Sequence, residues 1–268
     1  MTVQQAGGRH SWMDRWLSFN GWFVFAFLYL PILVVIVFSF SAAPNVGVWG
    51  GFSFRWYDQM AGNEQLLATL RNTLWVAFWS TIVATLLGTA AALAIDRYKR
   101  WIGRGTFDAI LYLPVIIPDV TMAVMLLLWF TQIGLPLGRS SIILAHIAFN
   151  ISFVAIVVRA RLAHMDPSME EAAADLYATR WQTFRRVTLP IIMPGVLGGG
   201  LLALTLSLDD VVITSFVQGP GSTTLPVHVF GLIRRSVTPE INAVSTLMVV
   251  ASMILVFASL AIQRRGQN

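Results

Sequence analysis

Three aspartates, Asp119, Asp209 and Asp210, lie within long apolar stretches of the sequence. A charged side chain in the middle of a membrane helix costs roughly 2.5–3.5 kcal/mol, and such residues commonly face a transport pathway or a charged partner. We therefore expect these carboxylates to balance the charge of a cation that moves along an apolar path. Adjacent helical residues diverge by about 100°, so one of Asp209 and Asp210 would line the path while its neighbour pairs with another helix or subunit. Alternatively, the three acids are structural and form buried pairs or helix caps.

The same acids, together with His146, define an alternative of another class, an intramembrane hydrolase. They show no spacing typical of an acid, a base and a nucleophile, and no metal signature. The sequence contains no cysteine, which excludes disulfides, thiolate metal sites and a cysteine nucleophile. His146 and Asn150 are four residues apart on one helix face, where hydrogen bonds to other helices are more common than ligand binding. We therefore expect no catalytic and no metal-binding residue in this chain.

The composition indicates that membrane helices position these residues. Hydrophobic residues make up 56% of the chain and charged residues only 12%, whereas soluble domains contain roughly 25% charged residues. A membrane-spanning helix needs about 20 mainly apolar residues, and a helix satisfies its own backbone hydrogen bonds in lipid. The sequence thus predicts an all-α integral membrane protein with one membrane domain over residues 18–262, flanked by segments 1–17 and 263–268. Six transmembrane helices are expected, at 18–41, 70–95, 107–131, 141–160, 191–217 and 241–262.

The distribution of basic residues predicts the orientation of these helices. If the amino terminus lies in the cytoplasm, thirteen of the 18 lysines and arginines fall on the cytoplasmic side. Because cytoplasmic loops of membrane proteins are enriched in such residues, we expect both termini inside the cell. The net charge of +5 is then explained by topology, and nucleic acid is not an expected partner.

Residues 161–190 form a charged insert between the fourth and fifth predicted spans, and no lipid-facing segment could hold it. The sequence predicts a first short helix that Asp166 or Ser168 caps. A second short helix over 180–187 would carry Trp181, Phe184 and Val187 on one face and end before Pro190. Periodicity alone leaves two alternatives open: a compact knob for a cytoplasmic partner, or an amphipathic loop on the membrane surface.

A motif within this insert favours the knob. The residues in question are Glu171-Ala172-Ala173, Tyr177, Val187 and Leu189-Pro190. They resemble the EAA loop of the inner-membrane subunits of binding-protein-dependent ATP-binding cassette (ABC) importers. That pattern is Glu-Ala-Ala, three residues, Gly, nine residues, Ile, one residue and Leu-Pro, and every spacing fits. Tyr177 replaces the glycine, which supplies a positive φ at little cost, so a tyrosine there would be strained or would alter the turn.

The resemblance implies the type I ABC importer permease fold and a non-catalytic subunit of the bacterial inner membrane. In that family the EAA loop is the coupling helix, which docks on the ATP-binding subunit. No Walker sequence occurs in the chain, so ATP and Mg²⁺ are expected in a separate ATPase and no cofactor is expected here. The implied partners are a second permease, two ATP-binding subunits and a periplasmic binding protein.

Three further segments suggest the solute. Residues 204–221, 238–246 and Pro118-Asp119-Val120 resemble the corresponding parts of polyamine importer permeases. The resemblance implies putrescine as the leading substrate and spermidine as the next. Another small cationic or amine-containing solute remains an alternative, because the periplasmic receptor largely selects the substrate in such systems.

Overall fold

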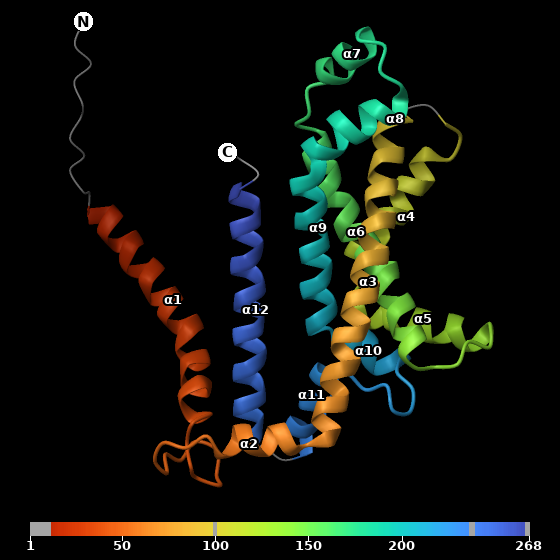
Figure 1. Cartoon of the computed structure of the whole chain (residues 1–268). Coiled ribbons are helices and arrows are strands. Elements are labelled where there is room, and N and C mark those ends of the chain that lie inside the picture. The colour runs from red at the N-terminus through yellow and green to blue at the C-terminus, as the bar shows by residue number, and fades with distance from the viewer. Residues whose placement is uncertain (1–11, 99–100, 236–238, 266–268) are drawn as a thin grey trace, which may run out of the picture. The chain divides into compact units, whose positions relative to one another are not determined.

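The structure, a computed structural model, describes residues 12–98, 101–235 and 239–265. In this part of the chain every regular element is a helix (Figure 1). The elements are α1 (Trp12–Phe38), α2 (Arg55–Gly62), α3 (Glu64–Arg97), α4 (Arg104–Ile116), α5 (Asp119–Gln132), α6 (Arg139–Leu162), α7 (Ser168–Asp175), α8 (Arg180–Thr183), the π-helix η1 (Phe184–Thr188), α9 (Leu189–Asp209), α10 (Val212–Val217), α11 (Leu225–Arg235) and α12 (Pro239–Arg265). Most of the predicted segment 1–17 and the last three residues of the predicted tail lie outside the described residues.

The chain divides into two compact units, residues 1–62 with 236–249, and residues 63–235 with 250–268. In the first unit, the connection from α1 to α2 is held by polar contacts. The Trp56 indole N–H donates to the Ser41 carbonyl at 2.7 Å, and the hydroxyls of Ser39 and Tyr57 lie 2.7 Å apart. Helix α1 has no buried residue, as expected of an apolar helix that faces lipid.

The second unit is built around α3, α6 and α9, which pack closely against one another. Glycines permit this approach. A Cβ on Gly88 of α3 would lie 2.7 Å from the Val154 Cβ of α6, and a Cβ on Gly200 of α9 would lie 3.0 Å from the Thr85 hydroxyl of α3. Helices therefore meet with little space between their backbones, as is typical of membrane bundles. Figure 1 shows α7 and α8 at one end of this bundle and α10 near the other end.

Every predicted span lies mostly on helix, but the predicted count of six is not confirmed. Among the described residues, four stretches are long and apolar enough to cross a membrane: 12–38, 64–97, 139–162 and 180–209. The pair α4 and α5 would make a fifth, although the two helices are bent by 115°. The predicted span 107–131 is therefore a broken one.

Two further predictions are corrected at the fifth span. The predicted helix 191–217 ends at Asp209 and resumes as α10 at Val212. The predicted second helix of the insert does not end before Pro190, because α8 continues through η1 into α9. A proline within a helix lacks the N–H for the usual bond to residue i−4. The π-helix directly before α9 changes the hydrogen-bond register at this point, which lets the helix pass through Pro190.

Candidate functional site

The three predicted aspartates meet at one cleft of about 470 Å³ in the second unit. The walls of this cleft come from the start of α5, the end of α9, the link between α9 and α10, and one face of α6. Its lining residues are Pro114, Asp119, Met122, Phe149, Phe153, Thr205, Leu206, Asp209, Asp210, Val211, Val212 and Ile213. Residues that are about 90 positions apart in the sequence thus line one cavity.

Pro118 explains how Asp119 reaches this cleft. The residue before a proline is driven out of the helical region, and Ile117 is extended, with φ −73° and ψ 133°. Helix α4 therefore stops at Ile116, and α5 begins with Asp119 as its first residue. An acidic side chain is favourable there because it lies at the positive end of the helix dipole. Pro118 therefore marks the break within the predicted span 107–131.

Asp210 holds the break between α9 and α10. It is extended, with φ −67° and ψ 124°, and its carboxylate accepts hydrogen bonds from the Ile213 N–H at 3.2 Å and the Thr214 N–H at 2.7 Å. The Thr214 hydroxyl adds a third bond at 2.7 Å, and His146 Nε2 lies 3.3 Å away. Asp210 is thus a capping and pairing residue, which agrees with the expectation that one of the two neighbouring aspartates pairs with another helix.

His146 bridges α6 to the region of the break. It is fully buried, its Nδ1 lies 2.7 Å from the Ser207 hydroxyl and its Nε2 lies 3.0 Å from the Thr214 hydroxyl. The expected interhelical hydrogen bonding of His146 is therefore confirmed. The same expectation is wrong for Asn150, since neither its amide nitrogen nor its carbonyl oxygen has a hydrogen-bond partner among the described residues.

Ser207, His146 and Asp210 include the three residue types of a hydrolase triad, but their surroundings do not suit catalysis. A nucleophile must reach a substrate carbonyl. Ser207 is only 4% exposed, does not line the cleft, and its hydroxyl lies 3.0 Å from the hydroxyl of Ser80 on α3. The trio is therefore an interhelical polar network, and the geometry does not support the hydrolase alternative.

Asp119 and Asp209 differ from Asp210 in their surroundings. Both are exposed at the cleft, and neither forms an ion pair with a described residue. The rings of Phe149 and Phe153, whose centroids are 6.5 Å apart, belong to the same lining. Unpaired carboxylates attract a cation, and aromatic faces stabilise one further when water is excluded. The sequence does not identify these two phenylalanines as site residues, because nothing in the local pattern distinguishes them from core residues.

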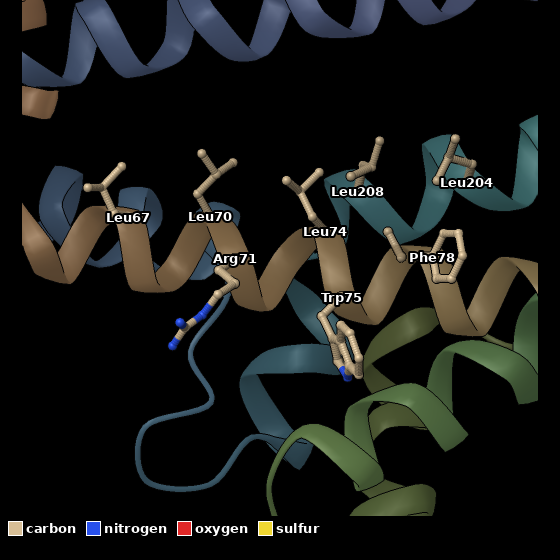
Figure 2. Close-up of a pocket in the computed structure, with 9 residues that line it drawn as sticks. Leu67, Leu70, Arg71, Leu74, Trp75, Phe78, Leu204 and Leu208 are labelled. Carbon is tan, nitrogen blue, oxygen red and sulfur yellow. The ribbon is translucent and has the colours of Figure 1, made fainter.

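A second cavity, of about 570 Å³, lies between α3 and α9 and has a different chemistry. Figure 2 shows Leu67, Leu70 and Leu74 of α3 on the same side as Leu204 and Leu208 of α9, whereas Arg71 points away from them. A cation that entered this cavity would lose its hydrating water, and the apolar lining would not compensate for that loss. Such a surface suits lipid tails or another apolar helix, so the aspartate cleft is the better candidate for a polar solute.

Asp166, one of the two predicted caps, accepts a bond from the first residue of α7. Asp166 Oδ1 accepts a hydrogen bond from the Ser168 N–H at 2.9 Å, and this bond lowers the pKa of the Asp166 carboxyl. Helix α7 then carries the Glu-Ala-Ala residues: Glu171 and Ala172 are exposed and Ala173 is half-buried. Later in the motif, Val187 lies in η1, and Leu189 and Pro190 lie in the first turn of α9.

Tyr177 adopts the bend that glycine normally provides. Its φ is +58°, and it is the one non-glycine residue with positive φ in the described chain. The Tyr177 N–H bonds to the Ala174 carbonyl at 2.9 Å, and the Ala178 N–H bonds to the Ala173 carbonyl at 3.1 Å. This pair of bonds is the Schellman motif that ends many helices. The turn is therefore kept, at the cost of strain in a tyrosine that is 96% exposed.

The family comparison agrees with this arrangement of helices and loop. Residues 84–266 match the family described as "Binding-protein-dependent transport system inner membrane component". The chain belongs to this family. Its members are membrane subunits of transporters, so the protein is a multi-pass inner-membrane permease and the 161–190 loop lies within the matched region.

Relatives of this permease include polyamine permeases. The putrescine transport system permease protein PotI of Escherichia coli (strain K12) is 42% identical over 250 residues, which cover 91% of this chain and 89% of the relative. The spermidine/putrescine transport system permease protein PotC of Haemophilus influenzae is 38% identical over 245 residues, covering 91% and 95%. The putative 2-aminoethylphosphonate transport system permease protein PhnV of Salmonella typhimurium is 29% identical over 252 residues, covering 90% and 92%.

Solved structures agree with the permease fold. A chain of a bacterial ABC transporter that imports alginate is similar to this permease with a TM-score of 0.76 and 20% identity, covering 96% of both chains. A chain of the MetNI methionine ABC transporter, in an inward-facing conformation, gives a TM-score of 0.62 and 19% identity, covering 80% of this chain and 99% of that one. At these identities the likeness concerns the fold alone.

Proposed function

We propose that this permease forms, with a second homologous permease, the path by which an ATP-driven importer carries polyamines across the inner membrane. Putrescine is the first candidate and spermidine the second. The observation that carries the proposal is the cleft in which Asp119 and Asp209 have no cationic partner among the described residues, with Phe149 and Phe153 beside them. Its acids suit the ammonium groups of a diamine, and the relatives named for putrescine and spermidine favour the same solutes.

The energy for transport would come from a partner subunit that hydrolyses ATP with Mg²⁺. The exposed Glu171 and Ala172 of α7, followed by Tyr177, offer an outward surface on which an ATP-binding subunit can dock. We infer two copies of that subunit and a periplasmic binding protein that delivers the solute. In this arrangement both termini and the 161–190 loop lie in the cytoplasm, in agreement with the bias of basic residues.

Reconstituted uptake tests the substrate. The complete importer in proteoliposomes would be given labelled putrescine, spermidine and 2-aminoethylphosphonate at equal concentrations, each with its receptor and ATP. We expect ATP-dependent accumulation of putrescine first and spermidine next. Accumulation of the zwitterionic phosphonate, with neither polyamine taken up, would reject a path specialised for cations. A sample without ATP measures passive leakage in the same vesicles.

A further inference from the structure

One carboxylate oxygen of the 161–190 loop, Oε1 of Glu170, accepts hydrogen bonds from side chains of two other elements. Arg97, the last residue of α3, donates from Nη2 to Glu170 Oε1 at 2.6 Å and to the Thr188 hydroxyl at 3.1 Å. Thr188 donates its own hydroxyl proton to the same Glu170 oxygen. We name Arg97, Glu170 and Thr188 the junction. Hydrogen bonds between ionised groups are stronger than neutral ones, so this contact restrains all three elements.

The junction lies where it can join α7 to the membrane helices. Thr188 is fully buried, and the side chains of Arg97 and Glu170 are 37% and 31% exposed. The backbone of α7 comes closest to α8 and η1, so long side chains make the connection between α7 and the end of α3. Without them, α7 would be tied to the bundle chiefly through the chain segments that connect it to α6 and to α9.

The neighbouring glutamate has a different environment. Glu171 is exposed and forms no ion pair with a described residue, although it follows Glu170 directly. Successive helical residues point about 100° apart, so one glutamate of the pair faces the rest of the chain and the other faces outward. This difference separates a group that holds the loop to the bundle from a group that is free to contact a partner.

The other end of the loop enters α9 through a register change. The Leu189 N–H bonds to the Phe184 carbonyl, five residues back, and this bond closes the π-helix η1. Just beyond it, Arg161 Nε of α6 donates to the Ile191 carbonyl at 3.1 Å. The start of α9 is thus anchored to α6, and Thr188, the last residue of η1, is also a member of the junction. Motion of α7 can therefore enter the bundle through η1 and through Arg97, in addition to the short link from α6.

We propose that Arg97 and Glu170 are positioning residues that make the end of α3 move together with α7. Movement that a docked partner imposes on the loop would then reach α3 and α9 at the same time. The inference rests on the proposed function, in which that partner is the ATP-hydrolysing subunit. It adds a specific route for force and assigns the two adjacent glutamates to separate tasks.

Distance measurements by electron paramagnetic resonance test the joint movement directly. Because the chain has no native cysteine, spin labels can be attached at Asp96→Cys on α3 and Ala174→Cys on α7, both exposed positions, with cysteine-free partner subunits. We expect the distance between the labels to stay narrow and unshifted from the nucleotide-free to the ATP-trapped importer. In a Glu170→Gln background it should broaden or shift, whereas Glu171→Gln should leave it narrow. A shift on ATP trapping with the junction intact, or no response to Glu170→Gln, would overturn the proposal.

Transport per hydrolysed ATP supplies a functional readout. Pairs in direct contact couple more strongly than distant ones, and partial exposure weakens an ion pair, so Arg97→Gln and Glu170→Gln should each lower this ratio about two- to fivefold. The double variant should be no worse than either single one, and the exchange of Arg97→Glu with Glu170→Arg should recover part of the loss. The amount of ATPase that co-purifies should stay unchanged.

The controls separate this role from folding and from docking. Glu171→Gln should reduce ATPase binding, while Thr188→Val tests the junction without altering a charge and should lower the transport ratio in the same direction. Additive losses in the double variant, or a fall in ATPase binding that accounts for the whole effect, would contradict the positioning role. If the unaltered importer carries neither polyamine, the proposed substrate fails, but the spin-label distances still decide whether α3 and α7 move together.

Discussion

Replacing Tyr177 by glycine should stabilise the turn that ends α7. A non-glycine residue in the left-handed region costs roughly 1–2 kcal/mol, and Tyr177 has a φ of +58°. Glycine removes that cost but loses more conformational freedom on folding, by roughly 0.5–1 kcal/mol. Because the tyrosine side chain is 96% exposed, little packing is lost. The net expected gain is therefore about 0.5–1 kcal/mol of local stability.

Hydrogen exchange followed by mass spectrometry measures this gain in the membrane-embedded protein. The amides of Tyr177 and Ala178 bond to the Ala174 and Ala173 carbonyls, so their protection reports on the turn. A change of 0.5–1 kcal/mol corresponds to a change in protection of about two- to fivefold. Tyr177→Gly should raise protection by that amount, and Tyr177→Val should lower it, since a β-branched residue is strongly disfavoured at positive φ. Lower protection in the glycine variant would refute the assignment of strain to Tyr177.

Two further substitutions test the packing. Asp210→Ala should cost about 2–3 kcal/mol of stability, because a helix cap is lost and buried partners are left unbonded. Thermal unfolding in detergent measures this loss. Asp209→Ala is the matched control, and an equal loss of stability there would contradict the separate roles of the two aspartates. Gly88→Ala should destabilise by about 1–3 kcal/mol, because its Cβ would lie 2.7 Å from the Val154 Cβ. The same assay on Gly105→Ala, where the space is open, should show little change, and equal losses would argue against close approach of α3 and α6.

Hydropathy and helix-breaking residues predict the parts of the fold that depend on local sequence. The apolar runs at 70–95 and 141–160 lie within α3 and α6, because the cost of exposing backbone in lipid makes helices of such runs. The interruption at Pro118 is likewise local, since proline excludes the residue before it from helix. The positive φ of Tyr177 could be anticipated from the motif spacing, in which a glycine normally stands at that position.

Long-range contacts explain what the sequence did not predict. The break after Asp209 depends on the bonds that Thr214 donates to Asp210 and on the approach of His146 from α6. Apolar periodicity contains no sign of either. Helix α11 was not predicted, because its sequence, which includes His228 and Arg234, is too short and too polar to match the pattern of a membrane span. The junction was missed for a similar reason, since Arg97 and Glu170 are 73 residues apart.

Uptake by an Asp209→Asn importer tests the central claim most directly. The variant removes one negative charge from the cleft and keeps the side-chain size, and Asp96→Asn on the exposed end of α3 serves as the matched control. A hydrogen bond to a charged group contributes about 1.5–3 kcal/mol, so the apparent KM for putrescine should rise roughly ten- to a hundredfold, with assembly unchanged. Unchanged putrescine and spermidine uptake in this variant and in Asp119→Asn would contradict the assignment of the cleft as the cation path.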